Sequence, residues 1–103
     1  MYYTYIIRCK DNSLYTGYTS DIKRRVKEHE KGINSKYTRA KGFEKLEVYF
    51  ISNTKSSAMK LESYIKKLTR KKKLLIIENP EKLLEELKIK NNYLVGKEIL
   101  TWH

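Results

Sequence analysis

The feature that most constrains the fold is a pair of strand-like segments at the start of the chain. Residues 2–9 read Tyr-Tyr-Thr-Tyr-Ile-Ile-Arg-Cys and residues 14–19 read Leu-Tyr-Thr-Gly-Tyr-Thr, with Lys-Asp-Asn-Ser between them. Aromatic and β-branched residues favour strands, and the four-residue cluster is typical of a turn. The pattern therefore predicts an antiparallel hairpin. Gly17 within the second strand indicates a bulge or a close approach of another group to the backbone.

The rest of the chain predicts one more strand among several helices, in a single domain of residues 1–90. A helix starts at Ser20-Asp21 and ends near Lys31, because Gly32 follows. The later elements are an ordered basic loop over 32–44, a strand over 46–51, an amphipathic helix from 53 or 54 to about 70, and a last helix from 79–81 to about 89. Residues 74–77 are an apolar run of undecided type, and residues 91–103 form a tail that either docks or frays.

The charge of the chain indicates a polyanionic partner. Among 103 residues, 23 Lys and Arg outnumber 12 Asp and Glu, which gives a formal net charge of +11. Basic side chains that neutralise phosphates gain free energy from counterion release, which favours nucleic acid. A second explanation is a lysine bias from the base composition of the coding DNA, because only five of the 23 basic residues are Arg.

Composition also excludes several classes of protein. No apolar run is long enough to span a membrane, and the first residues lack the pattern of a signal peptide. Cys9 is the single cysteine, which excludes an internal disulfide and a zinc finger. These features predict a reducing, cytoplasmic location.

Three charged or titratable residues have informative positions. Arg25 and His29 are four residues apart, so both lie on one face of the first predicted helix. Glu62 lies at the edge of the apolar stripe of the long helix and is the single acid among eight cations in residues 55–73. Its carboxylate is either held by these basic neighbours or binds a Mg²⁺ ion that also takes waters and phosphate oxygens.

Several spaced motifs resemble those of the GIY-YIG nuclease superfamily, and in particular of its small stand-alone members, similar to the nuclease domain of Slx-type endonuclease subunits. The motifs are Tyr3-Thr4-Tyr5, Tyr15-Thr16-Gly17, Thr19-x-Asp21-Ile22-x-x-Arg25-x-x-x-His29 and Ala58-x-x-x-Glu62-x-x-Ile65-Lys66. The resemblance extends from Tyr2 to about Ile77. It implies an α+β fold with a three-stranded antiparallel sheet flanked by helices, and hydrolysis of DNA phosphodiester bonds with one Mg²⁺ or Mn²⁺ ion.

The resemblance also implies catalytic roles for Tyr5, Tyr15, Arg25, His29 and Glu62. One of the two phenols takes the proton from the attacking water, and cationic neighbours are needed to favour its phenolate form. Arg25 binds the scissile phosphate, His29 binds phosphate or relays a proton, and Glu62 binds the metal. The alternatives are that the tyrosines are packing residues of the strands and that His29 caps the C-terminus of its helix.

Substrate contacts are expected from Gly17, Arg24, Lys36, Tyr37, Arg39 and Lys66. The first motif lacks the Gly and Ile of the family, and Asn79, the candidate for the late family asparagine, has a better role as a helix cap. We expect an endonuclease for branched, nicked or single-stranded DNA, as in DNA repair, whose affinity comes from its basic surface or from a protein partner. The alternatives are a non-catalytic DNA- or RNA-binding module and a ribosome- or RNA-associated protein.

Overall fold

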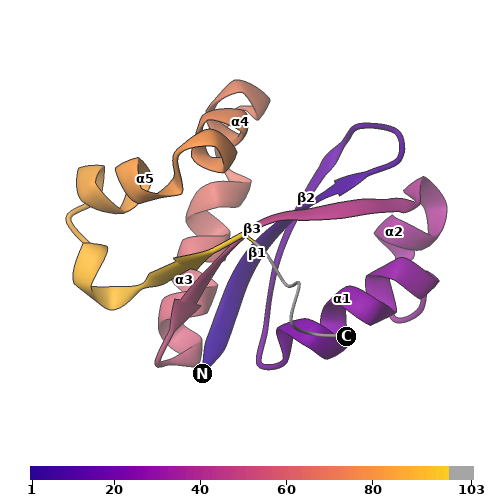
Figure 1. Cartoon of the computed structure of the whole chain (residues 1–103), viewed down its shortest axis with the longest axis horizontal. Helices are drawn as coiled ribbons and strands as arrows, with labels where there is room; N and C mark the ends of the chain where they lie inside the picture. Colours follow the sequence, from indigo (N-terminus) through magenta and orange to yellow (C-terminus); the bar gives the residue numbers. More distant parts are fainter. Residues whose placement is uncertain (98–103) are drawn as a thin grey trace.

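Four antiparallel strands form the sheet at the centre of the molecule, in the order β2-β1-β3-β4 (Figure 1). The computed structural model describes residues 1–97. The strands are β1 (Tyr2–Cys9), β2 (Leu14–Thr19), β3 (Phe43–Ser52) and β4 (Leu94–Gly96). The first two confirm the predicted hairpin, and the α+β fold class is confirmed.

The prediction of three strands is wrong, because β4 adds a fourth. Its three residues pair with the outer side of β3, with Phe50 opposite Val95 and Tyr49 opposite Gly96. So short a segment has no alternation that marks it as a strand. The free hydrogen-bonding edge of β3 supplies the pairing, and this edge exists only in the folded sheet. Residues 98–103 of the expected tail lie outside the described residues.

The helices differ from the prediction in two places. They are α1 (Ile22–Lys31), α2 (Lys36–Lys41), α3 (Lys55–Lys66), α4 (Arg70–Glu78) and α5 (Pro80–Glu86), followed by the short 3₁₀ helix η1 (Lys90–Asn92). The expected basic loop contains α2, because Ser35 accepts the backbone N–H of Thr38 and caps a helix. The expected long helix ends earlier, at Lys66, and the apolar run 74–77 of undecided type belongs to a separate helix, α4, which Thr69 starts by accepting the backbone N–H of Lys72.

Helices cover both faces of the sheet (Figure 1). Neighbouring residues of a strand point to opposite faces, so β1 contributes to two separate cores. The core against α1 contains Tyr5, Ile7, Ile22 and Val26. The core against α3, α4 and α5 contains Ile6, Val48, Phe50, Leu61, Ile65, Ile76, Leu83 and Leu84. Any site that joins α1 to α3 must therefore lie near an edge of the sheet.

Within residues 1–97, every helix is too short or too polar to cross a membrane.

Candidate active site

Tyr5 and Gly17 lie directly opposite each other on the paired strands β1 and β2. A Cβ atom on Gly17 would lie 2.6 Å from Tyr5 Oη and 2.8 Å from its Cζ. The phenol ring therefore extends over Gly17, toward the edge strand β2. The close approach that the sequence predicted at Gly17 is made by this ring.

The hydroxyl of Tyr5 is hydrogen-bonded to a buried histidine. Tyr5 Oη lies 2.8 Å from Nε2 of His29, and Nδ1 of His29 lies 3.1 Å from Oγ1 of Thr38. Asp21 caps α1 by accepting the backbone N–H of Arg24, and the helix then presents His29 to the sheet with 1% of its surface exposed. Burial, with a smaller effect of the Arg25 charge, lowers the pKa of His29 to about 4. The imidazole is therefore neutral at pH 7, and it does not supply a positive charge at the end of α1.

Arg25 is held from several sides. Its Nη1 donates to Oε1 of Glu28 at 3.0 Å and to the carbonyl oxygen of Asn34 at 2.9 Å. Burial lowers the pKa of the guanidinium, but its hydrogen bonds with Tyr5 and Glu28 raise this pKa by more, so the net shift is upward. The side chain keeps 18% of its surface exposed. A fixed, partly accessible guanidinium is suited to binding a phosphate.

The pKa of the Tyr5 phenol is set by its burial and by the groups around it. Burial raises this pKa to about 12, the hydrogen bond and charge of Arg25 oppose the rise, and Tyr15 and Glu62 add to it. Tyr5 therefore stays protonated at neutral pH. The expectation that cationic neighbours would favour a phenolate is wrong for Tyr5, because burial outweighs the effect of Arg25. Arg25, Tyr15 and Glu62 thus all contribute to the electrostatic environment of this hydroxyl.

Aromatic rings extend this cluster to α2. The Tyr15 ring is half-buried, and its centroid lies 5.5 Å from that of His29 and 6.4 Å from that of Tyr5. On its other side, the ring of Tyr37 from α2 lies 5.1 Å away. Tyr15 is thus the more accessible of the two phenols predicted at the site, since Tyr5 is only 1% exposed.

Glu62 is the acidic residue of this cluster that could hold a metal ion. Its side chain is 18% exposed, and Oε2 lies 3.3 Å from Nζ of Lys66 one turn along α3. Within residues 1–97 no group of three or more His, Cys, Asp and Glu side chains is arranged to hold an ion. A single carboxylate does not fit a site built from protein ligands alone. It fits Mg²⁺, which keeps several waters and binds one or two carboxylates together with phosphate oxygens of the substrate.

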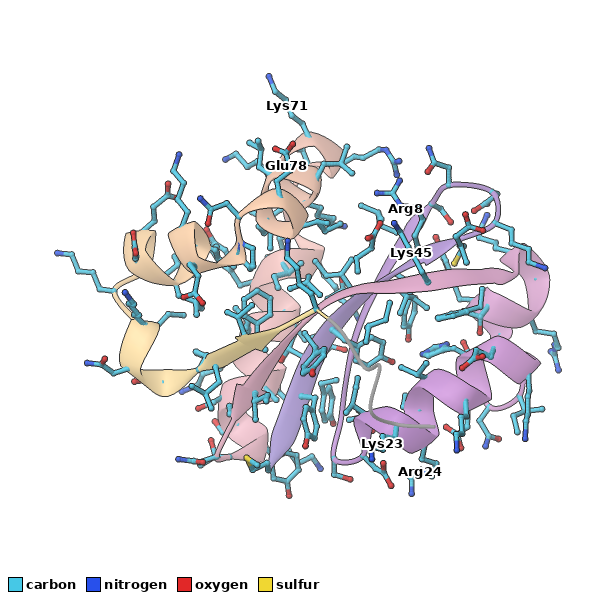
Figure 2. The ribbon with its side chains drawn as sticks, in the orientation of Figure 1. Arg8, Lys23, Arg24, Lys45, Lys71 and Glu78 are labelled. Atoms are coloured by element: carbon cyan, nitrogen blue, oxygen red, sulfur yellow. The ribbon has the colours of Figure 1, made fainter. Side chains whose placement is uncertain are left out.

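Some of the predicted substrate-binding residues lie at this cluster, and others do not. Tyr37 stacks against it, Lys36 and Arg39 are exposed on the same short helix, and Lys66 pairs with Glu62. Arg24 is separate, since it points away from the sheet at the start of α1 (Figure 2). Two hollows in the surface, of about 370 and 250 Å³, are lined by other residues.

Two contacts of this site could not be read from the sequence pattern. Thr38, which is 2% exposed, bonds His29, and the Asn34 carbonyl oxygen holds Arg25. Both belong to a segment that was expected to be a loop. The Ser35 cap was the available sign that Thr38 lies on a helix whose inner side is buried.

Comparison with known proteins agrees with this fold. The sequence model of one protein family, the GIY-YIG catalytic domain, matches residues 1–74. The chain therefore belongs to the GIY-YIG nuclease family. Within that family it is similar to small proteins that carry the UPF0213 name. The UPF0213 protein CPE1444 of Clostridium perfringens is 47% identical over 79 residues, which cover 77% of this chain and 85% of the relative. The UPF0213 protein YazA of Bacillus subtilis is 44% identical over 91 residues, 86% and 90% of the two chains.

A solved structure of the same group is also similar. The solution NMR structure of the UPF0213 protein BH0048 from Bacillus halodurans has 44% sequence identity and a TM-score of 0.50. The match covers 76% of this chain and 84% of that one. The suspected membership of the GIY-YIG superfamily, among its small members, is thus confirmed.

Proposed function

We propose that this protein is an endonuclease that hydrolyses DNA phosphodiester bonds with one divalent ion, Mg²⁺ or Mn²⁺. The observation that carries the proposal is the packed cluster of Tyr5, His29 and Tyr15, on which the charges of Arg25 and Glu62 act. These residues come from both strands of the hairpin and from helices on opposite faces of the sheet. Packing alone does not require a cation, a neutral imidazole and a carboxylate around one buried phenol.

Arg25 would bind the scissile phosphate. Its Nη1 is occupied by Glu28 and Asn34, which leaves other N–H groups of the guanidinium for Tyr5 and for phosphate oxygens. A guanidinium held in this way meets the charge that develops on the phosphate in the transition state without reorganising.

Tyr15 is the better candidate for the phenol that contacts the attacking water. Tyr5 is buried, protonated and already hydrogen-bonded to His29, whereas Tyr15 is half-buried beside the same imidazole. In this assignment Tyr15 acts in its phenolate form and takes a proton from the water as the water oxygen bonds to phosphorus, and the leaving oxygen departs with the electron pair of the bond that breaks. Tyr5 then serves to hold Arg25 and His29 in place.

Glu62 would hold the divalent ion against the phosphate. The ion, when bound, supplies positive charge to the non-bridging oxygens. In the free protein Lys66 balances the carboxylate, at 3.3 Å. Exchange of this partner for the ion would free the Lys66 ammonium to contact the nucleic acid backbone.

Exposed cations on three helices, α2, α3 and α4, are suited to hold the DNA on either side of the site. Lys36 and Arg39 lie on α2, and a run of cations extends from Lys66 through residues 70–73. Lys71 points outward from α4 (Figure 2). We propose branched, nicked or single-stranded DNA as the substrate, with a protein partner as a further source of specificity.

The test is cleavage of labelled linear, nicked, branched and single-stranded DNA, and of matching RNA, with Mg²⁺, with Mn²⁺ and with EDTA. The variants are Glu62→Gln and Arg25→Lys. Glu85→Gln is the matched control, because Glu85 also pairs with a lysine, Lys90, at 3.7 Å on another helix. We expect wild type and Glu85→Gln to cleave alike and the other two to lose activity.

Two results would contradict the proposal. Equal cleavage by all four proteins would mean that a contaminating nuclease produces the signal. Tight binding without cleavage by wild type, under every metal condition, would mean a non-catalytic nucleic-acid-binding module in which Glu62 only pairs with Lys66.

A further inference from the structure

The buried hydroxyl of Thr38 bonds the one side of His29 that does not face Tyr5. We propose that Thr38 is a positioning residue, which accepts the proton that His29 carries on Nδ1 and thereby stabilises the tautomer and ring orientation in which Nε2 accepts from Tyr5. The importance of this role for catalysis rests on the proposed nuclease function. The position of the proton itself is independent of that function.

The direction of the hydrogen bonds follows from Arg25. The positive charge of Arg25 acts on the Tyr5 hydroxyl, and a guanidinium has donors and no acceptor, so the hydroxyl proton is directed away from Arg25. The proton of the Tyr5 hydroxyl is then donated to its other neighbour, Nε2 of His29, at 2.8 Å. Nε2 accepts only when it carries no proton. The proton of the neutral imidazole is therefore on Nδ1, and Nδ1 donates it to Oγ1 of Thr38 at 3.1 Å.

The opposite direction would leave two donors facing each other. If Thr38 donated to Nδ1, the proton of His29 would be on Nε2 and would point at the Tyr5 oxygen. The Tyr5 proton would then point toward the guanidinium of Arg25, which can accept nothing. In a site where Tyr5 and His29 are each 1% exposed, water cannot relieve such an arrangement.

Thr38 also connects this hydrogen-bond chain to the helix that is proposed to hold DNA. Its side chain is 2% exposed on the inner side of α2, whereas Lys36 and Arg39 are exposed on the same helix. The segment before α2 reaches Arg25 a second time, through the carbonyl oxygen of Asn34 at 2.9 Å. Contacts of α2 with the substrate and the orientation of Arg25 are thus linked by two routes.

Nitrogen-15 NMR of the imidazole rings tests the proposal, because it shows which ring nitrogen carries a proton. A His103→Asn background leaves His29 as the single histidine. Thr38→Val removes the hydroxyl at nearly constant volume, and Thr38→Ser keeps it. Ser52→Ala is the control, since it removes another buried hydroxyl, which donates to the Thr54 carbonyl oxygen at 3.2 Å.

We expect the proton on Nδ1 in wild type, Thr38→Ser and Ser52→Ala, and a shift toward Nε2 in Thr38→Val. The kcat for DNA cleavage should fall about tenfold in Thr38→Val, as for the loss of one neutral hydrogen bond, and recover in Thr38→Ser. A wild-type proton on Nε2, or a Thr38→Val tautomer equal to that of wild type, would overturn the proposal. If wild type cleaves no DNA, the nuclease proposal fails while the NMR result still decides the role of Thr38.

Discussion

The substitution Gly17→Ala tests whether the Tyr5 phenol lies over β2. A methyl group on residue 17 would lie 2.6 Å from Tyr5 Oη, 2.8 Å from its Cζ and 3.1 Å from Tyr15 Cε2. Both distances to Tyr5 are shorter than any ordinary contact of a Cβ atom. The ring has little freedom to move, because it is 1% exposed and its hydroxyl is bonded to His29.

Three effects set the size of the loss in stability. Overpacking of a core costs about 1–3 kcal/mol. Displacement of the phenol breaks the 2.8 Å hydrogen bond with His29, and leaving buried polar groups unpaired costs roughly 1–3 kcal/mol more. In the opposite direction, replacing Gly by Ala in a strand stabilises the folded state by about 0.5–1 kcal/mol. The net loss is therefore about 3 kcal/mol, which corresponds to a fall in Tm of roughly 12–24 °C for a domain of this size.

The assay is urea unfolding and thermal melting, together with DNA cleavage under conditions where each variant is folded. Gly96→Ala is the matched control, because a Cβ on Gly96 would also meet a tyrosine ring, that of Tyr49 on the neighbouring strand. It should lower Tm while cleavage is retained, whereas Gly17→Ala should lower both. In a Tyr5→Ala background the cost of Gly17→Ala should disappear. An unchanged Tm, or the same cost in both backgrounds, would refute the placement of the ring.

Three further predictions concern the metal, the histidine and the basic surface. Glu62→Gln should abolish cleavage at millimolar Mg²⁺ and leave DNA affinity within about twofold, measured by fluorescence anisotropy, because most of the affinity comes from the cations. Because the pKa of His29 in the folded protein is lowered to about 4, this histidine takes up a proton at a higher pH in the unfolded state than in the folded state. Wild type should therefore lose about 2 kcal/mol of stability relative to His29→Gln between pH 7 and 4.5, in urea unfolding, and parallel curves would contradict the low pKa. Replacing the four cations of residues 70–73 by Gln should make DNA binding less dependent on salt, with the slope falling by about one for each phosphate that these side chains neutralise. An unchanged slope would exclude α4 from the interface.

Much of the fold could be predicted from local patterns. The hairpin and α1 were predicted because strand-forming residues, a turn cluster, Asp21 and Gly32 occur in order over neighbouring residues. The short elements α2 and β4 were missed. A helix of six residues has too few positions to show a period, and a strand of three residues is defined by the edge it pairs with.

The candidate site could likewise be predicted only in part. Motif spacing was enough to select Tyr5, Tyr15, Arg25, His29 and Glu62, but it does not contain the environment of each group. The buried state of Tyr5, the neutral state of His29 and the contact with Thr38 all depend on how α1 and α2 pack on the sheet. Arg24, adjacent to Arg25 in sequence, points away because neighbouring residues of a helix face different directions (Figure 2).

The sequence by itself determined which chemical groups are present, the order of the main strands and helices, and the membership of the GIY-YIG family. Only the tertiary structure decided which phenol is buried and which remains accessible, and that the close approach at Gly17 is made by Tyr5. The physical reason is the difference in how far along the chain each kind of interaction acts. Propensity, capping and side-chain periodicity act over a few residues, whereas desolvation and charge interactions depend on neighbours such as Tyr5 and Glu62 that are far apart in the chain.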